Sequence, residues 1–177
     1  DWSSDVCSSD LSYVSLVPTQ LLRLRDAISH DEFLLAQLRT FKAVLVGGQA
    51  VSSELVSEFR GLGVNIVTTY GMAETCGGCV YDGGALPGVE LKINASGAIA
   101  IKGLMLANDV AGSDGYLHTQ DLGEYFDGFL RVLGRADRVI NSGGLKIGLD
   151  QVEAVAGGVA GVVEVAATAL DSAEWGE

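Results

Sequence analysis

One segment, residues 41–71, constrains the fold more than any other, because two apolar runs in it flank a helical pattern. The runs are "FKAVLVGG" (41–48), which ends in a Gly-Gly turn, and "VNIVTTYG" (64–71). Between them, "SSELVSEFRGLG" has helical spacing, with Ser52 or Ser53 as its N-cap and a glycine at its end. A strand, a helix and a strand at this spacing predict a βαβ unit, and such a unit requires a parallel sheet.

Two loops follow the carboxyl ends of these predicted strands. The first is Gly47–Ala50, and the second is Tyr70–Glu74. Ligands on parallel sheets bind beyond the carboxyl ends of the strands. Because the two strands are expected to be neighbours, we expect both loops to face one crevice, and this crevice is the first candidate site.

The segment before the βαβ unit has helical patterns. Residues 15–28 predict an apolar turn followed by a helix that begins near Pro18 and Thr19, and residues 31–39 predict a second short helix. The buried side of the first helix is expected to carry Leu21, Leu22, Leu24 and Ile28.

After Gly84 the sequence changes to short apolar segments separated by turns, a pattern typical of an antiparallel, barrel-like unit. A helix at about residues 149–155 and a strand at about residues 162–167 are predicted to follow. The expected fold class is therefore α/β: a parallel βαβ sheet portion, a small antiparallel β-barrel-like subdomain, and the start of a small α+β C-terminal domain. Residues 1–11, "DWSSDVCSSDL", have no helix or strand period and predict a disordered or non-native leader.

Charge and composition argue against several classes of function. The formal net charge of -12 argues against nucleic acid as a partner, because binding to phosphates needs a surplus of lysine and arginine. The most apolar stretch, residues 155–170, is interrupted by Glu164 and is too short to span a bilayer, so we expect no membrane insertion. Three cysteines give no disulfide framework, which favours a reducing cytoplasm.

Cys76 and Cys79 form a Cys-x-x-Cys pair, which on its own suggests zinc or redox chemistry. Zinc would need two further ligands, and the remaining cysteine and histidines lie at no ligand spacing. A redox pair would begin a helix after a strand, but the Tyr70–Glu74 turn occupies that position. We therefore interpret the pair as two small packed thiols and keep a zinc or redox protein as the most distant alternative.

Several separate segments resemble one superfamily of enzymes. "TTYGMAE" (68–74), "GAIAIKG" (97–103) and the run from "YLHTQD" to "NSGG" (116–144) are similar to the adenylate-forming superfamily of acyl-CoA synthetases, luciferases and peptide-synthetase adenylation domains. Within it, "SLVPTQL" (15–21), "FKAVLVGGQA" and "YGMAETCGGCVYDGGALPGVELKI" look most like the o-succinylbenzoate–CoA ligases of menaquinone synthesis. The resemblance covers residues 12–177.

The resemblance implies a nucleotide site, and the residue types suit that chemistry. Tyr70 offers a flat apolar face on which adenine can stack, and Glu74 matches the carboxylate that holds Mg²⁺, a hard cation that prefers oxygen. Asp121 matches the carboxylate that accepts both ribose hydroxyls, and Arg135 matches a donor near the same sugar. The ATP- or AMP-binding residues that the resemblance implies are Gly48, Gln49, Ala50, Thr69, Tyr70, Gly71, Met72, Asp121 and Arg135.

Each of these residues also has an ordinary structural explanation. A tyrosine and a glutamate in a turn are commonly surface or packing residues. Asp121 can cap a β-turn, and Arg135 can form an ion pair with Asp137. The order and spacing of the whole set favour the nucleotide site over these separate explanations.

The resemblance also implies a domain organisation. Residues 12–134 match the C-terminal portion of the large AMP-binding domain, residues 135–138 match the hinge, with Asp137 as the hinge residue, and residues 139–177 match a truncated small C-terminal domain. The residues implied for the other ligands are Gly143 and Gly144, in an otherwise ordinary glycine turn, for CoA, and Pro18 and Thr19 for the acyl substrate.

The implied reaction has two steps. The carboxylate of a small-molecule acid attacks the α-phosphate of ATP, and the thiol of CoA then displaces AMP to give a thioester. The family's phosphate loop would precede residue 12, its adenylation lysine would follow Glu177, and Lys146 does not match that lysine. The resemblance therefore predicts an incomplete ligase that forms no thioester by itself, whose full-length form can be an oligomer.

Three residues depart from the family pattern. Ala73 replaces the usual hydroxyl residue beside the acid, and Gln120 and Ala98 are smaller departures. Two alternatives stay open at this point: another acyl-CoA synthetase of the superfamily, acting on a fatty or aromatic acid, and a non-catalytic nucleotide-binding or interaction-only remnant.

Overall fold

The predicted βαβ unit is present in the structure. Strands β2 (Ala43–Val46) and β3 (Ile66–Met72) are neighbouring and parallel, and helix α3 (Ser53–Gly61) connects them. Ser52 is the N-cap of α3, since its side chain accepts a hydrogen bond from the backbone N–H of Leu55 at 3.2 Å. Helix α3 therefore begins at the position that the sequence predicted, directly after a serine N-cap.

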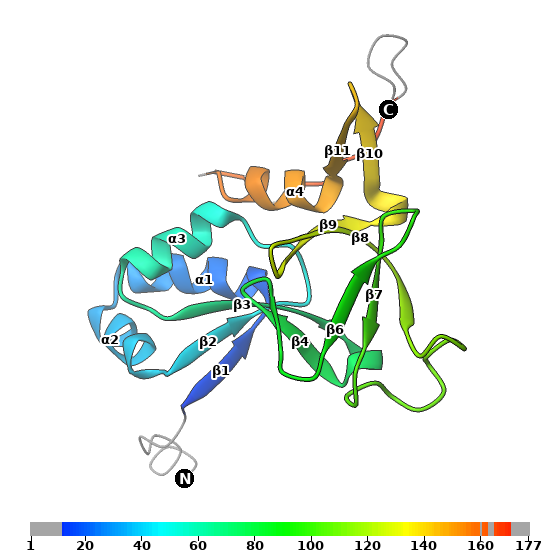
Figure 1. Cartoon of the computed structure of the whole chain (residues 1–177). Coiled ribbons are helices and arrows are strands. Elements are labelled where there is room, and N and C mark those ends of the chain that lie inside the picture. The colour runs from blue at the N-terminus through cyan, green and yellow to red at the C-terminus, as the bar shows by residue number, and fades with distance from the viewer. Residues whose placement is uncertain (1–11, 160, 163–164, 171–177) are drawn as a thin grey trace.

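The structure is a computed structural model that describes residues 12–159, 161–162 and 165–170. Figure 1 shows how its elements are arranged. The predicted leader at residues 1–11 lies outside the described residues. The further helical elements described are α1 (Pro18–Ile28), α2 (Glu32–Thr40), η1 (Ala73–Thr75), η2 (Ala136–Arg138) and α4 (Leu149–Gly157). The further strands described are β1 (Tyr13–Leu16), β4 (Gly77–Tyr81), β5 (Gly84–Ala85), β6 (Glu90–Ile93), β7 (Ala98–Lys102), β8 (Leu117–Phe126), β9 (Phe129–Arg135), β10 (Val139–Ser142) and β11 (Leu145–Gly148).

Nine strands form one mixed sheet in the order β1-β2-β3-β4-β5-β9-β8-β7-β6. The first three strands are parallel, and the strands from β4 onward pair antiparallel. Strand β3 joins the two parts, because Ile66 to Thr68 pair with β2 and the following residues, from Thr69, pair with β4. The predicted barrel-like closure is not confirmed: among the described strands, β6 pairs with β7 only, and the sheet stays open.

The apolar turn predicted before the first helix is wrong in part. Residues Tyr13–Leu16 form β1, which pairs in parallel with β2 from Tyr13↔Ala43 to Leu16↔Val46. Val14 and Leu16 are half-buried, while Tyr13 and Ser15 are exposed. This alternation covers only four residues, which is too short for a reliable strand signal in the sequence.

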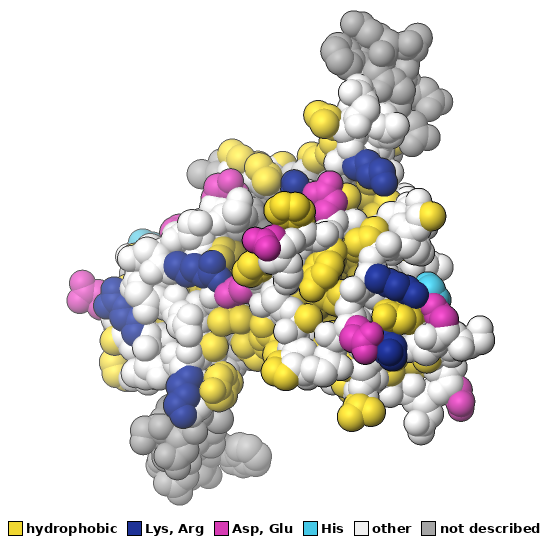
Figure 2. Space-filling model, viewed as in Figure 1, with side chains coloured by type: hydrophobic (Ala, Val, Ile, Leu, Met, Phe, Trp, Pro, Cys, Tyr) yellow, Lys and Arg dark blue, Asp and Glu magenta, His cyan; other side chains and the backbone are white. Residues whose placement is uncertain are grey.

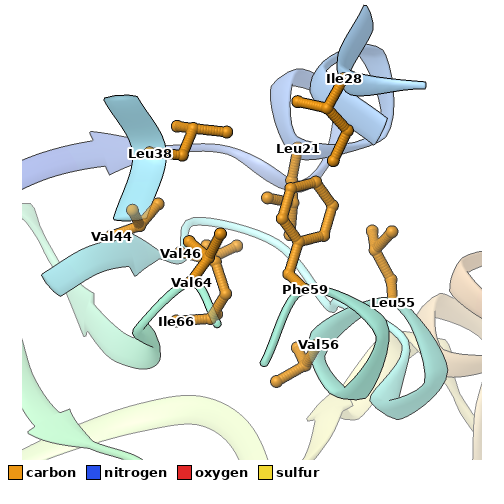
Figure 3. Close-up of a cluster of buried hydrophobic side chains, with 10 residues drawn as sticks. All are labelled: Leu21, Ile28, Leu38, Val44, Val46, Leu55, Val56, Phe59, Val64 and Ile66. Carbon is orange, nitrogen blue, oxygen red and sulfur yellow. The ribbon is translucent and has the colours of Figure 1, made fainter. Parts of the chain in front are cut away.

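The main hydrophobic core lies between helices α1–α3 and the parallel strands (Figure 3). Figure 1 shows the three helices together on one side of β1, β2 and β3. Leu21 and Phe59 are fully buried, whereas Leu22 and Leu24 are only partly buried against the cluster. The ten buried residues of the cluster are Leu21, Ile28, Leu38, Val44, Val46, Leu55, Val56, Phe59, Val64 and Ile66.

A second cluster lies within the antiparallel part of the sheet. Its buried members are Cys79, Val80, Ile99, Ile101 and Leu130, and Tyr70 and Met72 of β3 pack against it. The side chains of Tyr70 and Met72, in the segment predicted to bind the nucleotide, therefore pack on this apolar cluster.

The C-terminal elements rest on β9. Gln151 of α4 donates a hydrogen bond from Nε2 to the carbonyl of Val132 at 2.9 Å, while the β10–β11 hairpin projects away from the sheet (Figure 1). The strand predicted at residues 162–167 is not present in the described part of this segment, and residues 163–164 lie outside it. The backbone N–H of Ala167 instead donates to Oε1 of Glu153 at 2.7 Å, so a side chain of α4 occupies a donor that a sheet would use.

The surface is mixed in charge. On the face shown in Figure 2, basic side chains lie beside acidic ones rather than forming a continuous basic patch. Within the described part of the chain, every helix is too short or too polar to cross a membrane.

Candidate functional site

The candidate nucleotide site contains a direct contact between two residues that are distant along the chain. The phenol of Tyr70, in β3, donates a hydrogen bond to Oδ2 of Asp121, in β8, at 2.7 Å. The pKa of Tyr70 is raised far above its ordinary value. Burial is the largest cause, followed by the hydrogen bond to Asp121 and the negative charge of that carboxylate. Tyr70 is therefore a neutral donor, and Oδ1 of Asp121 has no hydrogen-bond partner among the residues the structure describes.

Thr119 fixes the backbone at Asp121. Its Oγ1 accepts a hydrogen bond from the N–H of Asp121 at 3.1 Å and donates one to the carbonyl of Ile99, in β7, at 2.9 Å. The ladders on both sides of β8 also shift register close to this point, between Leu122 and Gly123 on one side. Such irregularities re-aim side chains, and here they lie next to the carboxylate of the site.

The segment predicted as a loop at Tyr70–Glu74 is partly strand, because β3 continues to Met72. Gly71 allows this continuation: a Cβ there would lie 2.0 Å from the carbonyl oxygen of Gly77 in β4. Only glycine permits such a close approach of two backbones. The strand therefore carries the ring of Tyr70 along the surface of the sheet instead of leaving it in a free loop.

Glu74 lies in the short turn η1, immediately after β3, and its side chain is exposed. Thr75 holds the turn, since its buried Oγ1 accepts from the N–H of Met72 at 2.9 Å. The same hydroxyl lies 3.0 Å from the carbonyl of Met72 and 2.6 Å from that of Gly77. Glu74 is thus presented to solvent from a turn that the hydroxyl of Thr75 ties to the backbone of Met72 and Gly77.

The other predicted loop, Gly47–Ala50, lies beside Thr69 of β3. A Cβ on Gly47 would lie 2.7 Å from the carbonyl oxygen of Thr69, so the loop approaches β3 more closely than any other residue would permit. Gly48 has a φ of +83°, Gln49 is exposed and Ala50 is half-buried. This turn therefore lies next to the end of β3, as expected for parallel strands. The expected shared crevice is not found in the two cavities described for the structure, because Gly47 lines one of them and no residue of Tyr70–Glu74 lines either.

Arg135 is paired by register with Asp121 across β8 and β9, but its side chain bonds elsewhere. Nε donates to Oδ1 of Asp137 at 3.1 Å, and Nη2 donates to Oε1 of Gln120 at 2.6 Å. The ordinary explanation of Arg135, an ion pair with Asp137, is therefore present in the structure. The second acceptor of Arg135 is Gln120, which the sequence marked only as a departure from the family pattern.

A cavity of about 250 Å³ lies at the carboxyl ends of the parallel strands. We call it the carboxyl-end cavity. It extends from Thr69 of β3, past Gly47, to Gln20 of α1. Its nine lining residues are Ser15, Leu16, Val17, Gln20, Leu45, Gly47, Thr69, Gly78 and Tyr81.

Some predicted residues lie outside this cavity. Tyr70, Glu74, Asp121 and Arg135 do not line it, nor do they line a second cavity of about 370 Å³ beside Arg60. The acyl-site candidates, Pro18 and Thr19, lie at the start of α1 between two residues that line the carboxyl-end cavity, Val17 and Gln20. Pro18 is buried and Thr19 is exposed.

The predicted hinge and CoA residues lie after β9. Asp137 is an exposed residue of η2 whose carboxylate accepts from Arg135. Gly143 and Gly144 form the two-residue tip of the β10–β11 hairpin, with φ values of +58° and +85°. Two positive φ values in succession are those of a tight hairpin turn, which glycine adopts without strain.

The two cysteines of the Cys-x-x-Cys motif face different environments. Cys76 is exposed in a left-handed conformation after η1, and Cys79 is fully buried in β4. Burial raises the pKa of the Cys79 thiol, the opposite of what a reactive cysteine needs. No group of three or more potential metal ligands occurs within the described ranges.

The sequence interpretation missed several residues of the site. Thr75, Thr119 and Tyr81 gave no signal, because a hydroxyl acquires its role only from the backbone groups that the fold places around it. Gln20 had a signal: a glutamine at the third position of a helix commonly bonds back to the N-cap. Here its Oε1 accepts from the N–H of Val17 at 2.9 Å.

Three comparisons with known proteins bear on this site. Residues 1–106 match the family described as "AMP-binding enzyme". The chain is 41% identical over 156 residues to a probable 2-succinylbenzoate–CoA ligase of Mycobacterium tuberculosis, an alignment that covers 82% of this chain and 40% of the relative. The chain thus spans about two fifths of the length of the curated relatives it matches.

Solved structures of Bacillus subtilis o-succinylbenzoate CoA synthetase (MenE) are similar in fold. The complex of that enzyme with the acyl-adenylate intermediate OSB-AMP superposes with a TM-score of 0.73 at 27% identity, covering 93% of this chain and 39% of the other. The complex with ATP and a magnesium ion also has a TM-score of 0.73 at 27% identity, covering 93% of this chain and 40% of the other.

Proposed function

Because the chain belongs to the AMP-binding enzyme family, we propose that it forms part of a 2-succinylbenzoate–CoA ligase, an acid–thiol ligase that uses ATP and Mg²⁺. The observation that carries this proposal is the hydrogen bond between Tyr70 and Asp121, which joins an aromatic ring to a carboxylate at one point of the sheet. The identity to the mycobacterial relative supports 2-succinylbenzoate as the acid. We place the reaction in menaquinone synthesis in the cytoplasm, as the sequence resemblance and the few cysteines imply.

The nucleoside half of the site follows from these side chains. The ring of Tyr70 provides the stacking face for adenine, and the Gly48–Ala50 turn beside β3 lines the purine edge. Asp121 accepts the ribose hydroxyls on Oδ1, since Tyr70 already occupies Oδ2. Arg135 acts from the neighbouring strand by holding Gln120 and Asp137 at the rim. Thr69, Gly71 and Met72 complete the nucleotide-binding set.

Glu74 suits a magnesium site. It is an exposed carboxylate directly after the nucleotide-binding strand. Mg²⁺ is commonly held by one or two carboxylates together with phosphate oxygens and water, so a single protein ligand fits this ion. When bound, Mg²⁺ neutralises charge on the phosphates, and the role of Glu74 is to hold it on the phosphate side of the site.

The carboxyl-end cavity is suited to the acyl group. It begins at Thr69, the residue next to Tyr70, and its lining combines apolar side chains with neutral polar ones. An acid lying in it has its reactive carboxylate near the nucleotide end, with the start of α1 at Pro18 and Thr19 along its side. Volumes of a few hundred Å³ are typical of small-molecule sites.

The reaction then has two steps. A carboxylate oxygen of the acid forms a bond to the α-phosphorus of ATP, and the bond to pyrophosphate breaks. The sulfur of CoA next forms a bond to the acyl carbonyl carbon, its proton passes to solvent, and AMP leaves. The residues of this chain orient the reactants by holding the adenine ring, the ribose and the acyl group in fixed relative positions.

The remaining roles concern the second step. We place the hinge at residues 135–138, with Asp137 as the residue that absorbs the rotation, and the CoA-lining turn at Gly143 and Gly144. Residues 12–134 then belong to the large domain and residues 139–177 to the small one. The enzyme can form an oligomer, and its partners are small molecules rather than nucleic acid.

Calorimetric titration of the chain with AMP tests the nucleoside site. Asp121→Asn should weaken AMP binding at least about tenfold, because a hydrogen bond to a charged group contributes about 1.5–3 kcal/mol. Tyr70→Phe keeps the ring and should weaken binding less. Glu124→Gln is the matched control, since Glu124 is an exposed carboxylate of the same strand, paired at the surface with Arg131.

Other outcomes would favour the alternatives. Wild-type affinity that survives Asp121→Ala combined with Tyr70→Ala would rule out this site. If no ATP-derived ligand shifts the melting temperature, an interaction-only remnant is the better explanation. A full-length enzyme that prefers a fatty or simple aromatic acid in a substrate panel would keep the superfamily and replace the acid.

A further inference from the structure

On the β1 side, two strands away from β3, the carboxyl-end cavity is lined by Ser15, Leu16, Val17 and Gln20. Thr69 lies on β3, Gly47 follows β2, and Gln20 lies in α1, directly after β1. Neighbouring strands are about 4.8 Å apart, so the two ends of the cavity are separated by about 10 Å. A group that touches Gln20 is therefore at the distal end of any acyl chain activated beside Tyr70.

The amide of Gln20 is held in one orientation. Its Oε1 accepts a hydrogen bond from the backbone N–H of Val17 at 2.9 Å, as in one half of a capping box. Because the oxygen is bound to the helix N-terminus, the NH₂ group is the part of the amide left for a ligand. Among the residues the structure describes, this NH₂ has no hydrogen-bond partner.

The cavity offers hydrogen bonds but no formal charge. Its polar lining residues are Ser15, Gln20, Thr69 and Tyr81, and none of the nine lining residues is charged. The proposed substrate, a benzoic acid that carries a succinyl group, has two carboxyl groups. Whichever of them is activated, the other remains a carboxylate that must be accommodated in this cavity.

We propose that Gln20 is a specificity-determining residue whose amide NH₂ donates a hydrogen bond to the free carboxylate of the bound acyl group. This inference rests on the proposed function, because it takes the carboxyl-end cavity as the acyl site. A site that hydrogen-bonds a particular group discriminates strongly against analogues that lack it, because its donor is then left unpaired. Gln20 thus selects acids that have a second carboxylate at the distal end.

Gln20→Glu separates the two roles of the side chain. Glutamate also accepts the N–H of an N-cap residue, and a negative charge at a helix N-terminus is favourable, so α1 should be unaffected. The variant loses the donor and places a negative charge opposite the ligand carboxylate. Gln37→Glu, on an exposed position of α2, is the matched control for net charge.

The probes are AMP, a non-hydrolysable sulfamoyl adenylate of 2-succinylbenzoate, and the same compound with hydrogen in place of the free carboxyl. Binding is measured by calorimetry, and the melting temperature of each variant is measured alongside. Gln20→Glu should weaken the binding of the carboxylate-bearing compound at least about tenfold. The affinities for the other two probes should stay within about twofold of those of the wild type. Gln37→Glu should change none of the three.

Three results would overturn the inference. Equal weakening of the two adenylates by Gln20→Glu would mean that the residue shapes the cavity without contacting the carboxylate. Unchanged binding of the carboxylate-bearing compound would remove the donor role while the proposed function stands. If the wild-type chain binds none of the probes, the proposed function fails, and this inference fails with it.

Discussion

The phenol oxygen of Tyr70 lies 2.7 Å from Oδ2 of Asp121, although the two residues are 51 positions apart. Their strands, β3 and β8, are not neighbours: β4, β5 and β9 lie between them in the sheet order. In a flat sheet, four strand spacings would separate them by about 19 Å. The sheet must therefore curl strongly on itself, and the hydrogen bond joins the two sides of the resulting concave face.

The first prediction concerns the stability of this contact. Tyr70→Phe removes the donor and leaves the half-buried carboxylate of Asp121 without it, so the free energy of unfolding should fall by about 1–3 kcal/mol. Urea denaturation measures the change. Tyr125→Phe is the control, because Tyr125 is an exposed tyrosine of the same strand as Asp121. An equal effect of both substitutions would contradict a specific role for the contact.

The second prediction concerns alkaline pH. The pKa of Tyr70 is raised in the folded chain, chiefly by burial, so the contribution of Tyr70 to stability is complete below the ordinary tyrosine pKa of about 10. Above that pH the unfolded chain loses a proton that the folded chain keeps. The unfolding free energy should then decrease by up to about 1.4 kcal/mol per pH unit.

Comparison with Tyr70→Phe isolates this pH effect. The variant has no phenol at position 70, so its stability should decrease less steeply than that of the wild type above about pH 10. Tyrosinate absorbance gives an independent reading: the native variant and the native wild type should titrate with equal amplitude near this pH. A wild-type amplitude larger by one tyrosine of the five in the chain would show that Tyr70 ionises normally.

The third prediction concerns the turn that carries Glu74. Thr75→Val keeps the shape of the side chain but leaves the N–H of Met72 without its acceptor, which should cost about 1–3 kcal/mol of unfolding free energy. Thr75→Ser keeps the hydroxyl and should recover most of this loss. Thermal unfolding monitored by circular dichroism compares the variants. Serine and valine variants of equal stability would mean that the hydroxyl is not needed.

The fourth prediction concerns the approach of β3 to β4. Gly71→Ala would place a Cβ 2.0 Å from the carbonyl oxygen of Gly77, so the variant should lose more than about 3 kcal/mol of stability. Gly61→Ala is the control, because a Cβ at this last residue of α3 meets nothing within 4 Å. That control should be neutral or more stable by up to about 1 kcal/mol.

Much of the fold was accessible to sequence reasoning because its signals are local. Ser52 caps α3, apolar residues in helical spacing bury one side of it, and short apolar runs give β2 and β3. Strand β1 was not predicted because four residues carry too little periodicity. The strand predicted at residues 162–167 is absent from the described part of that segment, where the backbone N–H of Ala167 bonds Glu153 of α4 instead. Local pattern gives an element, but only its partners decide whether it joins a sheet.

The resemblance to adenylate-forming enzymes was readable from the sequence alone, because it depends on a tyrosine, a glutamate and an aspartate in family order. The parallel strands β2 and β3, which bring Gly47 beside Thr69, were readable there as well. Which groups these side chains bind depends on the fold. Tyr70 binds Asp121 because the sheet curls, and Arg135 binds Gln120 and Asp137 because its strand ends in a tight turn. This difference arises because the hydrogen bonds of a helix and the side-chain alternation of a strand depend on residues close in sequence, whereas contacts across a curved sheet depend on every strand between the partners.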